Sequence, residues 1–402
     1  MIKKIKIYIT LAAVAFSSVS CLDKYPEDAI PEGDAIRTVE EANQAVIGIY
    51  AYMKNPNLYS GLLTLLPDLQ ADLAYAVEGY TNTYGNIWRW DILPTNTEVE
   101  AVYGTLNALI GKCNFLLERI AVLEQEVDDE DYEKLQQFKG EALFARALSY
   151  SDLIKMYCKA YDPATAADEL GVVLVSSYSN AGTLKRASLK DSYQFVLDDL
   201  AQSATCLKPD ENENDESYYD TPYFTIYAVN ALYARVYLNM QEWDKAIEYA
   251  SKVIDSRKFK LSSTTEMIDS ETSYYQYMWQ YDHSTETIWK VGFTTTSYGG
   301  SLGQIFFNYD FNSFKPDYVP AEWVLNLYAD TDLRATTFFQ FYRTGYEHGL
   351  QWPLLAKYFG NQEFYEQNIL HVTMPKVFRL SEQYLIRAEA YCQKSNPEYG
   401  KG

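Results

Sequence analysis

Hydrophobic positions along most of this chain repeat every three to four residues, which is the period of an amphipathic helix. One apolar stripe runs from Ala42 to Met53, and a longer one continues for six turns from Val99 to Ile120. Ser/Thr-x-x-acidic capping boxes at Thr38, Thr97 and Ser188, and a Thr-Pro pair at 221–222, mark expected helix starts. The pattern predicts a helical core, with helices near 38–54, 98–123, 133–158, 188–206, 222–255 and 380–392.

One stretch of the chain has the spacing of a tetratricopeptide unit, in which small residues let two antiparallel helices approach closely. Its residues are Ala234, Tyr237, Trp243, Ala246, Ala250 and Val253. A similar small-x-x-Tyr signature beside an arginine recurs at 146–150 and 387–391. The wide spacing excludes a tandem array, so long insertions must separate the repeat helices. We therefore expect a mostly α fold, in which tetratricopeptide-like helix pairs form a right-handed superhelical scaffold with long irregular insertions and a few short strands.

Two insertions depart from the helical pattern, near 75–96 and 274–318. Both are rich in Trp, Tyr, Asn, Gly and Thr, which favours loops and short strands. The alternation of Trp289, Val291 and Phe293 makes 287–294 the best strand candidate.

The first twenty residues have the pattern of a signal peptide, with a basic start, an apolar stretch and small residues before Cys21. Ser18-Val19-Ser20-Cys21 is similar to a bacterial lipobox, which predicts cleavage before Cys21 and its lipidation. Residues 1–20 are thus expected to be a lipoprotein signal peptide and 21–37 an extended, lipidated tether. We expect the remainder, 38–402, to form a single domain that is held to the membrane only through this lipid.

Charge and composition limit the possible partners. Lys plus Arg number 34 against 55 for Asp plus Glu, a net charge of −21 that would repel phosphate backbones, so no nucleic acid is expected. The three histidines show no metal-ligand spacing, and the acidic loop 210–216 lacks the glycine of a calcium loop. We expect no metal and no cofactor.

The abundance of aromatic residues, 7 Trp, 37 Tyr and 18 Phe, suggests carbohydrate binding. Sugar rings present C–H patches that stack on aromatic faces and hydroxyls that bond to amides and carboxylates. Both kinds of group occur in the insertions, and the candidate ligand-binding residues are Tyr80, Tyr84, Asn86, Trp88, Trp90, Asp91, Asn96, Trp279 and Tyr281. The alternative is that Trp88 and Trp90 are core anchors of an irregular segment, because tryptophan is on average highly buried.

A catalytic alternative rests on the sequence Gly299-Gly300-Ser301-Leu302-Gly303, which matches the G-x-S-x-G pattern of serine hydrolases. Asp330 and His348 follow in the order that hydrolases use. A nucleophile elbow belongs to a parallel sheet between helices, and the chain lacks that alternation. We therefore expect no catalytic residue, and a hydrolase using Ser301 remains the lesser hypothesis.

Several segments in order carry a resemblance to a known family. They are the lipobox, Gly140-Glu141-Ala142-Leu143-Phe144-Ala145-Arg146-Ala147, Gly171-Val172-Val173-Leu174-Val175, the pattern Tyr193-x-x-Val196-x-x-Asp199-Leu200, the pattern Ala231-x-x-Ala234-Arg235-Val236-Tyr237, and the run from Arg379 to Ala390. Together they resemble the SusD/RagB family of Bacteroidetes outer-membrane lipoproteins. The resemblance spans essentially the whole chain, and the chain resembles a C-terminally truncated member.

The resemblance implies a function in nutrient uptake without chemistry. Members hold a nutrient at the cell surface as a lid over a TonB-dependent (SusC-like) outer-membrane barrel, and most handle glycans in polysaccharide utilisation. The expected function is therefore that of a surface-exposed outer-membrane lipoprotein that binds an oligo- or polysaccharide and delivers it to the barrel. A peptide-binding member of the same family is the alternative.

Overall fold

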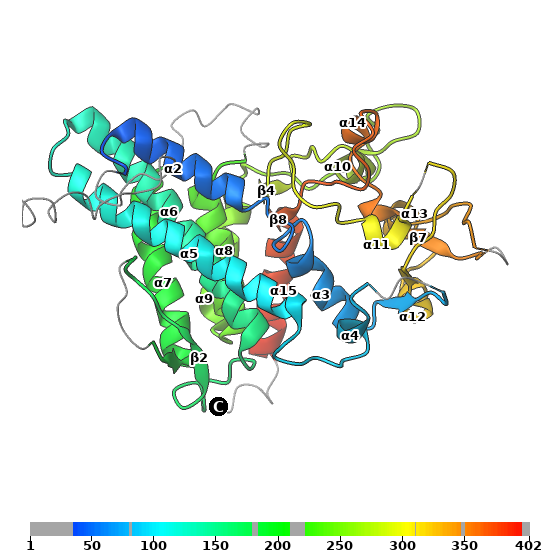
Figure 1. Cartoon of the computed structure of the whole chain (residues 1–402), viewed down its shortest axis with the longest axis horizontal. Helices are drawn as coiled ribbons and strands as arrows, with labels where there is room; N and C mark the ends of the chain where they lie inside the picture. The colour runs from blue at the N-terminus through cyan, green and yellow to red at the C-terminus, as the bar shows by residue number, and fades with distance from the viewer. Residues whose placement is uncertain are drawn as a thin grey trace, which may run out of the picture.

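The computed structural model describes residues 35–79, 83–178, 184–209, 222–309, 311–346 and 350–395. Long helices dominate one side of the molecule, and shorter elements gather on the other (Figure 1). The mostly α fold class is confirmed. The long helices are α2 (Val39–Tyr52), α5 (Thr97–Leu123), α6 (Asp129–Tyr157), α7 (Leu189–Cys206), α8 (Ile226–Asn239), α9 (Trp243–Asp255) and α15 (Leu380–Ser395).

The shorter helices lie mainly within the insertions. They are α3 (Leu62–Gln70), α4 (Gly85–Trp88), α10 (Tyr274–Gln280), α11 (Gln304–Phe307), α12 (Glu322–Leu325), α13 (Leu333–Phe338), the 3-10 helix η3 (Ala356–Tyr358) and α14 (Gln362–Tyr365). The strands are β1 (Ala74–Ala76), β2 (Leu170–Val173), β3 (Arg186–Ser188), β4 (Thr287–Lys290), β5 (Tyr318–Pro320), β6 (Phe339–Phe341), β7 (Pro353–Leu355) and β8 (Lys376–Arg379).

In the described parts of the chain, the strands form only two-stranded antiparallel sheets, β1–β5, β2–β3, β4–β8 and β6–β7. The strand predicted at 287–294 is confirmed over β4. All four β4 residues are buried, including Lys290 between the alternating positions Trp289 and Val291, because the strand lies inside the protein core.

Two of the four predicted N-caps are confirmed and two are wrong. The hydroxyls of Thr38 and Ser188 accept hydrogen bonds from the backbone three residues on, as N-caps do. Helix α5 begins at Thr97 itself, after Asn96. Helix α8 is capped by Thr225 rather than by the 221–222 pair, because tertiary contacts hold the preceding segment. There Trp289 Nε1 donates to the Pro222 carbonyl at 2.9 Å, and the Phe224 N–H donates to the Tyr50 hydroxyl at 2.8 Å.

Small residues join α8, α9 and α15, as the tetratricopeptide spacing predicts. Ala234, Ala246, Ala250 and Ala390 are fully buried in one cluster, against which Tyr237 and Trp243 pack. Close approach of the three helices leaves no space for larger side chains at these alanines.

The arginines of the repeated signature tie helices together. Arg146 donates to both carboxylate oxygens of Asp199 at 2.8 and 2.6 Å and to Asn114 at 2.7 Å, joining α6, α7 and α5. Arg235 makes the same forked contact with Glu382 of α15, at 2.7 and 2.8 Å. Such bidentate pairs fix orientation as well as distance.

A second hydrophobic core supports the short elements, and we refer to this part as the small lobe. It buries residues of α3, β1, α11, β5, β7 and η3, with Phe307 and Tyr318 fully enclosed. Within the described residues, no helix combines the length and the apolar character needed to cross a membrane.

Candidate functional site

A pocket of about 330 Å³ lies where the two predicted insertions meet, and we call it the Tyr84 pocket. The first insertion contributes Thr83 and Tyr84, and the second contributes a run of residues around α11. The loop before α3 and α3 itself close the remaining side. The full lining is Pro56, Ser60, Gly61, Leu65, Thr83, Tyr84, Gly300, Ser301, Gln304, Ile305, Asn308 and Asp317.

The glycines of the 299–303 motif let this loop lie directly against neighbouring backbone. A Cβ on Gly303 would stand 1.8 Å from the Tyr358 carbonyl oxygen, and one on Gly299 would stand 2.6 Å from that of Lys54. Ser60 fastens the loop by accepting a hydrogen bond from the Gly300 N–H at 2.9 Å. The glycines of the G-x-S-x-G motif are thus explained by the close packing of this loop around the pocket.

Besides hydroxyl groups, the pocket is lined by two amides and a carboxylate on or near α11. Gln304 Nε2 donates to Asn308 Oδ1 at 2.8 Å, which fixes both amides relative to each other. Asn308 ends the helix in the left-handed conformation, at φ 43°. Asp317 is buried, and its backbone N–H donates to the Ile305 carbonyl at 2.8 Å. Paired amides of this kind can exchange hydrogen bonds with hydroxyl groups.

Tyr84 provides the aromatic face of the pocket. It precedes α4 in the left-handed conformation, at φ 56°, and its ring is half-buried. Burial, followed by the charge of Glu98, raises the pKa of the Tyr84 phenol, so the group stays protonated and can donate a hydrogen bond.

Trp88 is held by the small lobe. Its indole Nε1 donates to the Ala74 carbonyl at 2.9 Å, and its ring lies edge-on to Tyr318 at 6.3 Å between centroids. The half-buried ring packs against the second core. These contacts favour a structural role for this tryptophan.

Trp90 is placed differently, with 64% of its surface exposed. It has a positive φ of 60°, which is uncommon for a bulky residue and costs conformational energy. The exposed ring therefore stays available for stacking.

The remaining candidates of the first insertion shape its loop. Asn86 accepts a hydrogen bond from Arg89 at 3.0 Å, and the Asp91 N–H donates to the Asn86 carbonyl at 2.9 Å. Asn96 Oδ1 accepts from the Leu93 N–H at 2.5 Å. Tyr80 lies outside the described residues.

Trp279 and Tyr281 are not brought to the Tyr84 pocket. Figure 1 shows α10, which carries Trp279, and α4 on opposite sides of α3. The Trp279 ring lies 5.0 Å from the ammonium groups of Lys357 and Lys376 and 5.1 Å from the Arg379 guanidinium. Tyr281 stacks on Tyr277 at 4.6 Å. Both rings thus already have partners within the protein.

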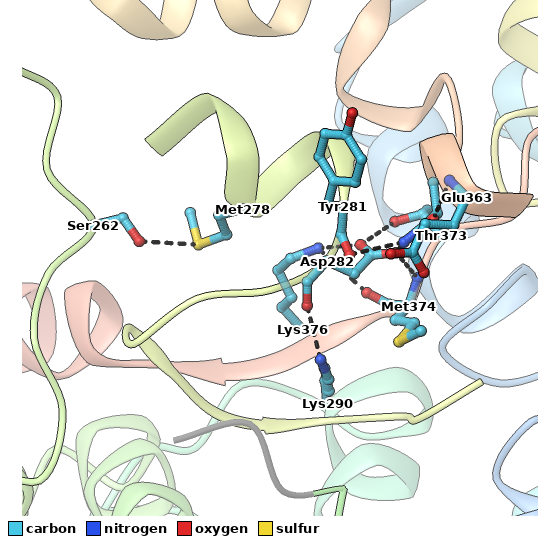
Figure 2. Close-up of polar contacts among 10 residues, drawn as sticks. Ser262, Met278, Tyr281, Asp282, Lys290, Glu363, Thr373, Met374 and Lys376 are labelled. Carbon is cyan, nitrogen blue, oxygen red and sulfur yellow. Dashed lines mark hydrogen bonds and ion pairs between the residues drawn. The ribbon is translucent and has the colours of Figure 1, made fainter. Parts of the chain in front are cut away.

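A buried carboxylate fixes the segment after α10 (Figure 2). Asp282 is fully buried and accepts hydrogen bonds from Thr373, the Met374 N–H and Lys376 at 2.9, 2.9 and 2.5 Å. Its carbonyl accepts from Lys290 at 2.8 Å. Burial lowers the pKa of Lys376, and Asp282 opposes that shift. The cluster anchors Tyr281 to β4 and β8.

Ser301 does not have the surroundings of a hydrolytic nucleophile. It lies exposed in a turn before α11, and every sheet in the described parts of the chain is a two-stranded antiparallel pair. The proposed partner His348 lies outside the described residues.

The acidic loop 210–216, which was considered as a calcium loop, also lies outside the described residues. Among the histidines, His371 is a buried core residue whose ring stacks on Phe307.

Sequence reasoning missed Gln304, Asn308 and Asp317. Glutamine and asparagine carry no distinctive pattern within an irregular insertion, and α11 is only four residues long. The glycine-rich motif 299–303, which directly precedes α11, was the available sequence signal for this site, because the close packing of the motif shapes the wall of the Tyr84 pocket.

Comparisons with known proteins agree with this architecture. A SusD-like family model, described as "Starch-binding associating with outer membrane", matches residues 22–238, more than half of the chain. The chain therefore belongs to the SusD-like family. A curated relative is SusD-like protein P2 of Formosa agariphila, 23% identical over 257 residues, which are 63% of this chain and 46% of that protein. The match thus spans about half of the relative's length.

Solved structures show the same fold. A SusD superfamily protein of Bacteroides thetaiotaomicron has a TM-score of 0.73 at 22% identity, covering 90% of this chain and 77% of the other. A putative sugar binding protein of Bacteroides vulgatus has a TM-score of 0.72 at 22% identity, with 91% and 76% covered. Surface glycan-binding protein A of Bacteroides uniformis has a TM-score of 0.68 at 16% identity, with 89% and 77% covered.

Proposed function

We propose that this chain is a cell-surface lipoprotein that binds a glycan at the Tyr84 pocket and delivers it to a TonB-dependent outer-membrane barrel. The observation that carries the proposal is the convergence of the Tyr84 ring with the paired amides of Gln304 and Asn308 in one pocket. This combination suits a sugar, since a ring face and hydroxyl partners are offered together. The family description and the names of the structural relatives support the same ligand class.

Exposed aromatic rings on the two insertions that form the pocket extend the proposal to a chain longer than one sugar. Trp90 follows the short helix α4, which Tyr84 caps, and Tyr298, 46% exposed, directly precedes the glycine-rich loop. A pocket for one ring with neighbouring stacking surfaces suits an oligosaccharide. The proposal needs no catalytic residue, metal or cofactor.

Calorimetric titration of the purified chain, residues 22–402, with panels of oligosaccharides and peptides tests the ligand class. We expect binding to an oligosaccharide, and the double variant Gln304→Ala, Asn308→Ala should weaken it about tenfold through lost hydrogen bonds. Gln202→Ala, an exposed site on α7, is the matched control and should leave affinity unchanged. Binding to peptides alone would favour the peptide-uptake alternative and overturn the glycan assignment.

A further inference from the structure

A second pocket, of about 150 Å³, lies in the small lobe on the other side of α3 and α11, and we call it the Lys357 pocket. The two helices separate it from the Tyr84 pocket, since α11 presents Ile305 to one and Phe306 to the other. Its wall is mostly aromatic and aliphatic, with the rings of Phe306, Tyr328, Phe338, Phe339 and Tyr358. Two charged residues, Asp68 and Lys357, complete it.

The Lys357 ammonium is surrounded by aromatic rings. It lies 4.9 Å from the Tyr358 centroid, 5.0 Å from that of Trp279 and 5.4 Å from that of Phe338. Among the described residues, none accepts a hydrogen bond from it and none forms an ion pair with it. Ring faces attract a cation but do not replace the hydrogen bonds that its three N–H groups make in water.

Asp68, on α3, is the opposite charge of the same pocket. Its carboxylate likewise has no hydrogen-bond donor or ion-pair partner among the described residues, Lys357 included. Burial raises the pKa of Asp68, and the charge of Lys357 opposes the shift. One pocket thus holds a cation and an anion that do not pair with each other, and since both side chains are half-buried, a ligand that bonds to both would replace water at two charges.

The size of the pocket limits what could join these two groups. A cavity of about 150 Å³ accepts a molecule the size of benzene, and drug-sized ligands need about 300 Å³ or more. A single six-membered ring fits. A sugar ring would leave several hydroxyls facing apolar walls without partners, whereas a flat aromatic ring would match those walls.

We propose that the Lys357 pocket binds one monocyclic aromatic hydroxy acid, whose carboxylate accepts hydrogen bonds from Lys357 and whose hydroxyl donates to Asp68. The ligand supplies the missing partner of each charged group while its ring lies among the five aromatic side chains. This site is distinct from the Tyr84 pocket, and neither proposal depends on the other.

The charges around Lys357 predict how binding responds to pH. The facing groups are Asp68 of α3, Arg379 and Lys376 of β8, and the Tyr358 phenol, which burial keeps protonated. Burial lowers the pKa of Lys357 to about 8, which Asp68 opposes and the two cations reinforce. A carboxylate ligand binds the protonated lysine, so affinity should fall about tenfold between pH 7 and pH 9.

The test is calorimetric titration of the full chain with 4-hydroxybenzoate, benzoate and glucuronate. We expect 4-hydroxybenzoate to bind more tightly than benzoate, and glucuronate more weakly than both. Benzoate, whose own charge is constant from pH 7 to pH 9, serves for the pH comparison. These titrations use the unaltered protein, so their outcome does not depend on whether a substituted protein folds.

Two variants test the separate roles of the Lys357 and Asp68 charges in binding. Lys357→Met keeps an unbranched side chain that is one atom shorter and should weaken 4-hydroxybenzoate at least tenfold, and Asp68→Asn should remove its advantage over benzoate. Lys315→Met, at an exposed lysine of the same lobe, is the control and should change neither affinity. Absence of binding by the unaltered chain, equal binding by folded Lys357→Met, or tighter binding of glucuronate would each overturn the proposal.

Discussion

Trp88 and Trp90 are two residues apart in the sequence, yet their surroundings predict opposite effects of substitution. Trp90→Ala removes a ring that is 64% exposed, so the thermal midpoint should barely change. If the ring stacks on a glycan, affinity should fall by about 1 to 3 kcal/mol, as for loss of one aromatic anchor. Calorimetry and thermal unfolding of the same variant measure both quantities.

Trp88→Ala should instead lower stability, because it removes a ring from the second core together with the hydrogen bond to Ala74. We expect a loss of roughly 3 kcal/mol in the free energy of unfolding, at the lower end for a tryptophan truncation since the ring is half-buried. Unchanged stability with lost affinity would show that Trp88, too, contacts the ligand.

Asp282 is the residue whose loss should cost most in the cluster of Figure 2. Asp282→Ala removes the carboxylate that accepts from the Thr373 hydroxyl and from the Lys376 ammonium, which keeps only the longer contact of 3.4 Å to the Met374 carbonyl. Breaking such a buried pair costs about 3 to 5 kcal/mol. Glu130→Ala, which removes an exposed partner of Lys134, is the control and should change stability little, because solvent screens the pair. Similar denaturant midpoints for the two variants would contradict the assigned importance of the cluster.

Helix contacts decide the effect of enlarging the small residues. Ala234 is fully buried where α8, α9 and α15 meet, so Ala234→Trp should separate these helices and destabilise by about 1 to 3 kcal/mol or more. Ala121→Trp, on an exposed face of α5, introduces the same ring without overpacking. Chemical denaturation compares the two, and a neutral Ala234→Trp would contradict the close approach of the helix pair.

The sequence predicted the long helices well because their evidence is local. The stripe from Val99 to Ile120 identifies α5, and the hydroxyls of Thr38 and Ser188 act as caps. The start of α8 was missed because the contacts of Pro222 and Phe224 with Trp289 and Tyr50 are long-range. Such tertiary contacts leave no periodic signal in the segment they hold.

The candidate site could be predicted only in outline. Composition located both insertions. It did not show that α11 places Gln304 and Asn308 in one pocket with Tyr84. The tryptophans look alike in sequence, whereas Trp88 is held by the small lobe, Trp90 is exposed and Trp279 faces three cations. Which ring is free depends on the surrounding fold, which composition does not encode.

The molecule as a whole should be more stable in mild acid than at pH 8. Burial raises the pKa of Glu141 and Asp152, whose carboxylates accept hydrogen bonds from Tyr50 and Tyr59. At pH values above the usual pKa of a carboxyl group, the folded state therefore holds more protons than the unfolded state. Stability then falls as pH rises through the raised pKa values of the folded state. The net charge of −21 adds repulsion in the same direction.

Scanning calorimetry from pH 5 to pH 8 at constant salt measures this dependence. We expect the midpoint to fall by roughly 1 to 2 °C over the range, the shift that 1 kcal/mol or somewhat more produces in a chain of this size. Glu141→Gln should flatten the profile, whereas Glu130→Gln, at an exposed position, should leave it unchanged. A midpoint that rises toward pH 8 would contradict the assigned direction.

Anchoring of the whole molecule is predicted to depend on Cys21, which lies outside the described residues. The lipobox-like sequence 18–21 and the proline-containing segment after it would suit a lipidated end joined to the helical domain by a tether. One acyl chain binds a membrane only weakly, so stable anchoring requires multiple acylation. Cys21→Ala should therefore release the protein from the outer-membrane fraction while the glycan affinity of the purified domain stays the same. Retention of the variant on intact cells, still accessible to added protease, would show that something other than this lipid holds it there.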